Sequence, residues 1–104
     1  MMPALRVLRE AAEELDAAAA YLERERPGYA ALFLNAYEEK LRQLARFPAS
    51  GPAIQNAPGR YPLRAFLIGK FPYSIIAGPI DGVMTIVAVA HTSRDPGYWR
   101  RRVD

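Results

Sequence analysis

The final segment of the chain, residues 91–104, holds the side chains best suited to chemistry or molecular recognition. It contains the only histidine, His91, the only tryptophan, Trp99, and four arginines, and it directly follows a strand-like run, Val83–Ala90. Cationic, aromatic and titratable groups therefore leave the predicted sheet at one edge. His91 can exchange a proton near neutral pH, and Arg94 carries a planar fork of donors that matches phosphate or carboxylate oxygens.

The same segment also has a purely structural interpretation. Tyr98 and Trp99 can pack their rings on the sheet. His91 can donate to a backbone carbonyl at the strand end, and Arg94 can pair with Asp95 or with a helix acid. We expect Trp99 to be the packing anchor of this segment. Its arginines are expected to be mostly exposed: Arg94, Arg100, Arg101 and Arg102.

Composition limits the class of protein. The chain has 104 residues, 51% of them hydrophobic, which suits a single domain over residues 1–104 with a modest core. Cysteine is absent and histidine occurs once, so we expect no disulfide, no metal site and no cofactor. No run of about 18 apolar residues occurs, and the N-terminus lacks a signal-peptide pattern. We therefore expect a cytoplasmic protein that does not contact a membrane.

Charge is unevenly distributed along the chain. Residues 1–59 carry seven Lys/Arg and eight Asp/Glu, whereas residues 60–104 carry seven Lys/Arg and three Asp/Glu. The second half is therefore strongly basic. Such a surface attracts an acidic partner, either nucleic acid or protein, or is simply a solvated basic face.

The first half of the chain has the periodicity of two helices. Residues 5–8 read as a short strand, residues 10–25 as a helix that ends at Pro27 and Gly28, and residues 28–47 as a second helix. A Pro-Gly turn between two helices predicts an antiparallel hairpin. The second helix carries an apolar stripe for which we expect core or partner packing: Tyr29, Phe33, Tyr37, Leu41 and Leu44.

The second half begins with a loop and then reads as strands. Residues 48–62 hold four prolines without periodicity, which predicts a surface loop. Strands are expected over 61–68, 71–77 and 83–90, with turns at Gly69–Lys70 and over 78–82. The last strand is apolar on both faces and should be central. The fold class is thus α+β: a short N-terminal strand, a helix hairpin packed on the sheet, and a three-stranded antiparallel meander.

One basic residue interrupts the hydrophobic run of the first meander strand. Arg64 shares a face with Phe66. It is either an edge residue whose guanidinium reaches out to solvent, or a cation that the sheet presents to a ligand.

The order of these elements resembles the RelE/ParE superfamily of toxins from type II toxin–antitoxin systems, which includes proteins labelled as plasmid stabilisation proteins. The resemblance covers nearly the whole chain. The segments that carry it are 10–16, 44–48 with Gly51, 63–64, 71–76, 87–91, and the final motif built from His91, Arg94, Pro96, Tyr98 and Trp99.

The superfamily has two mechanistic branches. RelE-like members cleave mRNA on the ribosome, whereas ParE-like members bind and poison DNA gyrase without a catalytic constellation of their own. If the chain were a ribonuclease, the resemblance would assign catalysis to Arg64, His91, Arg94 and Tyr98. RelE-like enzymes usually present a pair of basic residues on the second strand and an arginine at the start of the third. Here Arg64 stands without that pair, the third strand begins at Phe71, and Lys70 lies in the preceding turn.

These departures favour the ParE-like branch, which would make the chain a binding toxin and not an enzyme. The resemblance then implies growth inhibition through DNA gyrase and neutralisation by a cognate antitoxin. Two alternatives stay open: a RelE-like ribonuclease acting on the ribosome and mRNA, and a non-toxic antitoxin-binding module. The candidate target- or nucleic-acid-binding residues are Arg64, Lys70, His91, Arg94, Tyr98, Trp99 and Arg102.

Overall fold

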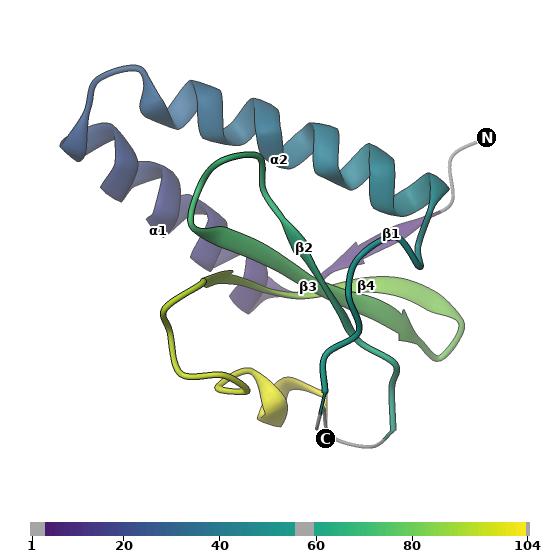
Figure 1. The fold of residues 1–104 in the computed structure, drawn as a ribbon. Coiled ribbons are helices and arrows are strands. Elements are labelled where there is room, and N and C mark those ends of the chain that lie inside the picture. Colours follow the sequence, from purple (N-terminus) through teal and green to yellow (C-terminus); the bar gives the residue numbers. More distant parts are fainter. Residues whose placement is uncertain (1–3, 56–59, 104) are drawn as a thin grey trace.

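The computed structural model describes residues 4–55 and 60–103, which form a mixed four-stranded sheet with a helix hairpin on one face. The strands lie in the order β1-β4-β3-β2, with β1 parallel to β4 and the other neighbours antiparallel (Figure 1). This confirms the predicted α+β class and the meander. The bounds are β1 Leu5–Val7, α1 Arg9–Glu25, α2 Tyr29–Arg46, β2 Arg64–Leu67, β3 Tyr73–Ile80, β4 Val83–His91 and a 3-10 turn η1 Arg100–Arg102.

The turn between α1 and α2 is closed by a side chain of the first helix. Gly28 takes the left-handed conformation, with φ 92°, which glycine adopts without a steric penalty. The Glu23 carboxylate accepts the backbone N–H groups of Gly28 at 3.0 Å and Ala30 at 3.1 Å. It therefore satisfies donors that the start of α2 would otherwise leave unpaired, and it places negative charge at the positive end of the helix dipole.

The apolar stripe of α2 forms the core between the hairpin and the sheet. Phe33, Tyr37 and Leu44 are buried. The Phe33 ring makes edge-to-face contacts with Phe71 and Tyr73, at 5.3 Å between centroids in both pairs. The packing interpretation is therefore confirmed for these three residues of the stripe, whereas Tyr29 and Leu41 are partly buried at the edge of the core. Leu32 is the most exposed large apolar residue of α2, at 57%.

Strand β3 is longer than expected, and this corrects the predicted turn over 78–82. Gly78 and Pro79 pair with Thr85 and Met84, and only Asp81 and Gly82, with φ 50° and 81°, form the turn. A side chain at position 78 would lie 2.7 Å from the Pro62 carbonyl oxygen, so this glycine permits a close backbone approach inside a strand. Strand β2, in contrast, is shorter than the predicted run over 61–68.

Strand β4 occupies the predicted central position and is covered on both faces. Its residues 85–89 are all buried, Thr85 among them. The register shifts between Ile76 and Ala77, so that Ile76 pairs with Ala88 and Ala77 with Ile86. Val87 is therefore an extra residue without a partner on β3, as in a β-bulge.

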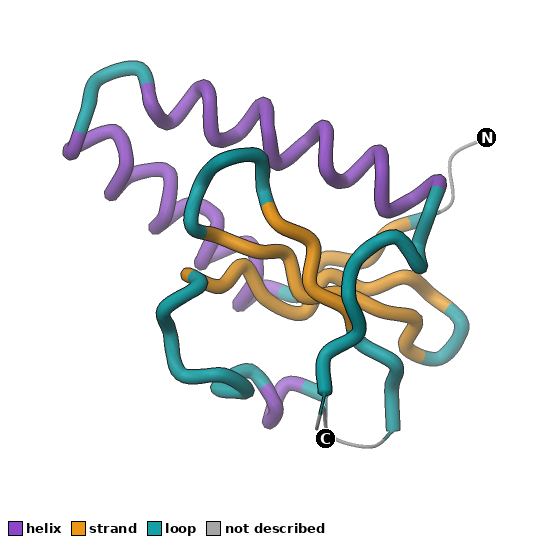
Figure 2. The backbone as a smooth tube through the Cα atoms, in the orientation of Figure 1, coloured by secondary structure: helices purple, strands orange, loops and turns teal. Residues whose placement is uncertain are grey.

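The face of the sheet opposite the helices is covered by the C-terminal segment, residues 92–103, hereafter the tail. In Figure 1 the tail (yellow) lies on the far side of the sheet from α1 and α2. Figure 2 shows that most of the tail is loop. Trp99, 4% exposed, packs with Val103 into a second core over Val87. The prediction that Trp99 anchors the tail is confirmed.

The loop after α2 runs along the outer edge of β2. Ala65 N donates to the Pro52 carbonyl and Ile54 N to the Leu63 carbonyl, both at 3.0 Å. Residues 52–54 of the predicted loop therefore shield this edge strand from unwanted pairing, while residues 56–59 lie outside the described part of the chain. Within the described residues, no helix is long and apolar enough to cross a membrane.

Candidate functional site

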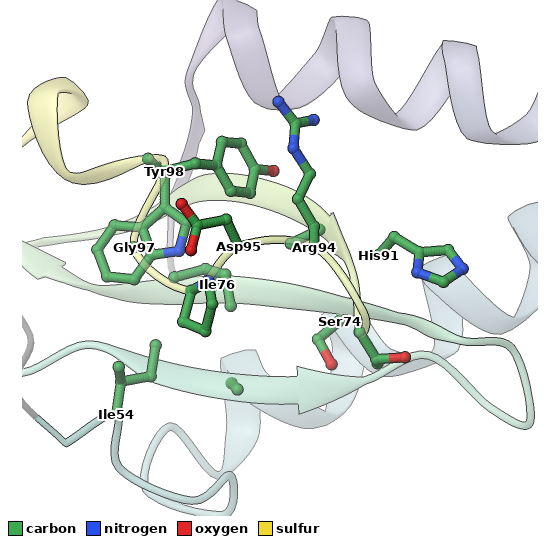
Figure 3. Close-up of a pocket in the computed structure, with 13 residues that line it drawn as sticks. Ile54, Ser74, Ile76, His91, Arg94, Asp95, Gly97 and Tyr98 are labelled. Atoms are coloured by element: carbon green, nitrogen blue, oxygen red, sulfur yellow. The ribbon is translucent and has the colours of Figure 1, made fainter.

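A cavity of about 250 Å³ lies where the tail leaves the sheet, on the face away from the helices (Figure 3). We call it the tail pocket. Its floor comes from strands β2 to β4 and its far wall from the tail. The lining residues are Ile54, Ala65, Ser74, Ile76, Ala90, His91, Thr92 and Arg94–Trp99. Four of the predicted site residues, His91, Arg94, Tyr98 and Trp99, are therefore brought together.

His91 is the last residue of β4 and is partly buried. Its Nδ1 accepts the Ser93 backbone N–H at 3.1 Å and lies 2.7 Å from the Ser93 hydroxyl oxygen. The expected bond to a backbone carbonyl is replaced by this local turn. Because Nδ1 accepts a backbone proton, the neutral ring carries its own proton on Nε2. The ring also contacts Tyr73 edge-to-face at 5.1 Å.

Arg94 is exposed and stacks on an aromatic ring of the tail. Its Cζ atom lies 3.9 Å from the centre of the Tyr98 ring, and Figure 3 shows the side chain extending beside that ring. Among the described residues Arg94 forms no ion pair, so neither Asp95 nor a helix acid neutralises it. Stacking uses the face of the guanidinium, which leaves the in-plane N–H donors available to a partner.

Tyr98 and Arg102 are bound to helix α1 through Glu14. Glu14 Oε2 accepts the Tyr98 hydroxyl at 2.5 Å and Arg102 Nη2 at 3.1 Å, while Oε1 accepts Arg102 Nη1 at 2.7 Å. The expectation that Arg102 is mostly exposed is wrong, because its side chain is only 17% exposed in this pair. Both terminal nitrogens of the Arg102 guanidinium donate to the Glu14 carboxylate on α1, and this bidentate pair holds the Arg102 side chain against the protein.

The Glu14–Arg102 pair also completes the backbone hydrogen bonding of β4. Strand β1 pairs with β4 only over residues 84–86. Beyond that point Glu14 Oε1 accepts the Val89 N–H at 3.1 Å, and Arg102 Nη1 donates to the carbonyl of the bulged Val87 at 3.1 Å. Two side chains thus take the place of a neighbouring strand.

This network shifts the pKa values of its members. Burial of the Glu14 carboxyl by itself raises its pKa, but the hydrogen bonds from Arg102, Tyr98 and Val89 outweigh burial and hold the pKa below its usual 4.5. Burial and the hydrogen bond to Glu14 raise the pKa of Tyr98 well above its usual range. The bond to Glu14 likewise raises the pKa of Arg102. The network therefore contains a carboxylate, a neutral phenol and a guanidinium near neutral pH.

Glu14 was not among the predicted site residues. The position of Glu14 in the helix does indicate that its side chain lies on the buried face, because Glu14 lies three residues after Ala11 and four before Ala18, both of which are buried. An acid on the buried face of a helix requires a partner. The sequence allowed a tail arginine to pair with a helix acid but suggested Arg94 for that role, whereas the partner of Glu14 is Arg102.

Arg64 and Lys70 are not part of the tail pocket. Arg64 Nη1 donates to the Gly51 carbonyl at 2.7 Å and thereby holds the loop after α2 on β2. Lys70 lines a different cavity beside α2, together with Tyr29 and Phe71. Arg94 is therefore the only Lys or Arg that lines the tail pocket among residues 4–55 and 60–103.

The described residues contain no group of three or more His, Cys, Asp and Glu side chains able to hold a metal ion. The tail pocket is mostly apolar, and its titratable lining residues are His91, Arg94, Asp95 and Tyr98, of which Arg94 forms no ion pair among the described residues. Such a site can bind a side chain of a partner beside an acidic group.

Comparison with known proteins assigns the chain to a class of small toxins. Residues 5–96 match the family described as "ParE toxin of type II toxin-antitoxin system, parDE". The chain therefore belongs to the ParE toxin family, which confirms the ParE-like assignment within the RelE/ParE superfamily. The match ends before Tyr98, Trp99 and Arg102.

A solved structure has a similar fold. A chain of the chromosomal ParDE TA system from P. aeruginosa is 21% identical, with a TM-score of 0.70 over 86% of this chain and 96% of that one. A search of curated proteins finds no match.

Proposed function

We propose that this protein inhibits growth by binding DNA gyrase and that a cognate antitoxin neutralises it in the cytoplasm. Membership of the ParE toxin family supports the toxin role and an antitoxin partner. The observation that carries the choice of a binding mechanism is the distribution of cations. Arg102 is paired with Glu14 and Arg64 is bonded to the Gly51 carbonyl, which leaves Arg94 as the one arginine that the described part of the chain places at the tail pocket.

The distribution of cations argues against phosphoryl transfer at the tail pocket. A ribonuclease must stabilise a phosphorane with several preorganised donors, and the loss of one such donor typically reduces the rate by about 10²–10³. At this pocket one guanidinium and one imidazole are present where a cluster is required. Recognition of a protein requires fewer cationic groups than phosphoryl transfer, because one stacked arginine beside an apolar cavity is typical of a binding hot spot.

The second part of the proposal concerns the antitoxin. A cavity of about 490 Å³ lies between α2 and the β2–β3 turn, lined by Leu22, Tyr29, Leu32, Ala36 and residues 69–72. Leu32 is more than half exposed there, and Lys70 and Arg26 flank the apolar surface, with the Arg26 guanidinium 5.2 Å from the Tyr29 ring. This combination suits an amphipathic antitoxin segment with apolar anchors and acidic neighbours.

The runner-up function is a ribosome-dependent mRNA endoribonuclease. One observation favours it, namely that His91 and Arg94 line the same cavity. In that case Arg94 would bind a phosphate and His91 would transfer a proton. A third candidate, a non-toxic antitoxin-binding module, predicts neither gyrase inhibition nor RNA cleavage.

Induced expression distinguishes these functions. We expect growth arrest, accumulation of cleaved DNA–gyrase complexes and an intact transcript pool, with growth restored by co-expression of the cognate antitoxin. Cleaved transcripts without DNA breaks would support the ribonuclease instead. Normal growth with antitoxin binding retained would support the inert module.

A further inference from the structure

Glu14 has no acceptor capacity left. A carboxylate offers about four acceptor sites, and the two oxygens of Glu14 receive Val89 N–H, the Tyr98 hydroxyl and both terminal nitrogens of Arg102. The Glu14 charge is therefore compensated within the network. Arg94 does not bind Glu14 and forms no ion pair among the described residues.

The network fixes the ring on which Arg94 stacks. The Tyr98 hydroxyl is bonded to Glu14, and the Cζ atom of Arg102 lies 5.2 Å from the centre of the same ring. An arginine side chain ordinarily samples many rotamers, and ordering it on binding costs free energy. Stacking Arg94 at 3.9 Å on a ring that is already fixed reduces this cost before the target arrives.

We propose that Glu14 is a positioning residue for target recognition: by binding Tyr98 and Arg102 it fixes the aromatic surface from which Arg94 presents its N–H donors to an acidic segment of the target protein. This inference rests on the proposed function, because it assigns Arg94 a protein target. It adds a residue of helix α1 to a site that otherwise consists of strand, loop and tail residues.

A double-mutant cycle with full-length toxin and purified gyrase holoenzyme tests the proposal. Glu14→Gln keeps the size of the side chain and removes its charge, and Arg94→Ala removes the presented guanidinium. We expect Glu14→Gln to weaken gyrase binding on the order of tenfold at a temperature where the variant is folded. Arg94→Ala should then add little in the Glu14→Gln background. The matched control is Glu13→Gln, whose side chain is 69% exposed and pairs only with Arg9 at the surface.

A purely structural role for Glu14 predicts a different pattern. Glu14→Gln would lower the melting temperature but leave the affinity of the folded protein unchanged, and Arg94→Ala would cost the same in both backgrounds. Either result overturns the proposal. If Glu14→Gln does not fold, Glu14→Asp replaces it, since this variant keeps the charge but withdraws the carboxylate from Tyr98 and Val89.

A second measurement separates this inference from the proposed function. The ring current of Tyr98 shifts the side-chain proton resonances of Arg94, and Glu14→Gln should move those resonances toward free-arginine values, whereas Glu13→Gln should not. If the wild-type toxin does not bind gyrase but the resonances move, the proposed target is wrong and the positioning role stands. If they do not move, the positioning role is wrong whatever the target.

Discussion

Glu14 and Arg102 lie 88 positions apart in the sequence, and the Glu14 Oε1 and Arg102 Nη1 atoms are 2.7 Å apart in the structure. The two side chains are 16% and 17% exposed. They connect the first helix to the end of the chain and satisfy the backbone of β4 where β1 stops. One ion pair thus secures the tail that carries Arg94, Tyr98 and Trp99.

The lowered pKa of Glu14 predicts acid sensitivity of this connection. A carboxyl whose folded pKa lies below its unfolded value of 4.5 stabilises the fold above that pH, and the stabilisation is lost as pH falls through the folded pKa. Glu14→Gln should therefore cost about 1.5–3 kcal/mol of unfolding free energy at neutral pH, as expected for a hydrogen-bonded charge. Urea denaturation of both proteins across the acidic range measures this difference.

The difference between wild type and Glu14→Gln should begin to shrink as pH falls below 4.5, where the carboxyl of the unfolded chain becomes protonated, and should disappear as pH falls through the lower pKa of the folded protein. If the two unfolding free energies differed by the same amount at every pH, the lowered pKa of Glu14 would be contradicted. Glu13→Gln is again the control, and its unfolding free energy should stay within about 0.5 kcal/mol of wild type because it is a surface substitution.

Trp99→Ala should destabilise the protein strongly. Trp99 is 4% exposed and packs in the second core, and truncation of a buried aromatic costs about 3–5 kcal/mol. For a domain of this size the melting temperature should fall by about 12 °C or more. The control is Arg101→Ala, since Arg101 is exposed in the same tail. A similar melting temperature for both variants would mean that the tail does not pack on the sheet.

Periodicity was sufficient to predict the two helices and the central strand, and the size and apolar character of Trp99 were sufficient to predict that it anchors the tail. These features depend on local patterns, namely apolar residues at helical spacing and a strand apolar on both faces. The same approach gave a wrong prediction for Gly78 and Pro79, because they are typical turn residues but here lie inside β3. At Gly78 the Pro62 backbone approaches closely, which no local pattern indicates.

The site was only partly predictable for a related reason. His91, Arg94, Tyr98 and Trp99 are close in sequence and line one cavity. Arg64 and Arg102 were assigned to the same surface on chemical type alone. Their partners are a loop carbonyl, Gly51, and a helix acid, Glu14, which only the tertiary fold brings near.

Arg64→Met should therefore change stability more than function. The variant loses the charged hydrogen bond to the Gly51 carbonyl, which is worth about 1.5–3 kcal/mol. Growth inhibition should be retained at a temperature where the protein is folded. Arg42→Met, at an exposed position of α2, is the control for removing one charge. Loss of toxicity with an unchanged melting temperature would instead place Arg64 in contact with the target.

The central claim is that the tail inhibits DNA gyrase through Arg94, and a supercoiling reaction with purified gyrase tests it most directly. Wild-type toxin should inhibit supercoiling. Arg94→Ala should have an unchanged melting temperature, because Arg94 is exposed and forms no ion pair among the described residues, yet should inhibit on the order of tenfold less, as expected for loss of a hot-spot arginine. Normal supercoiling in the presence of wild-type toxin, or full inhibition by Arg94→Ala, would contradict the account.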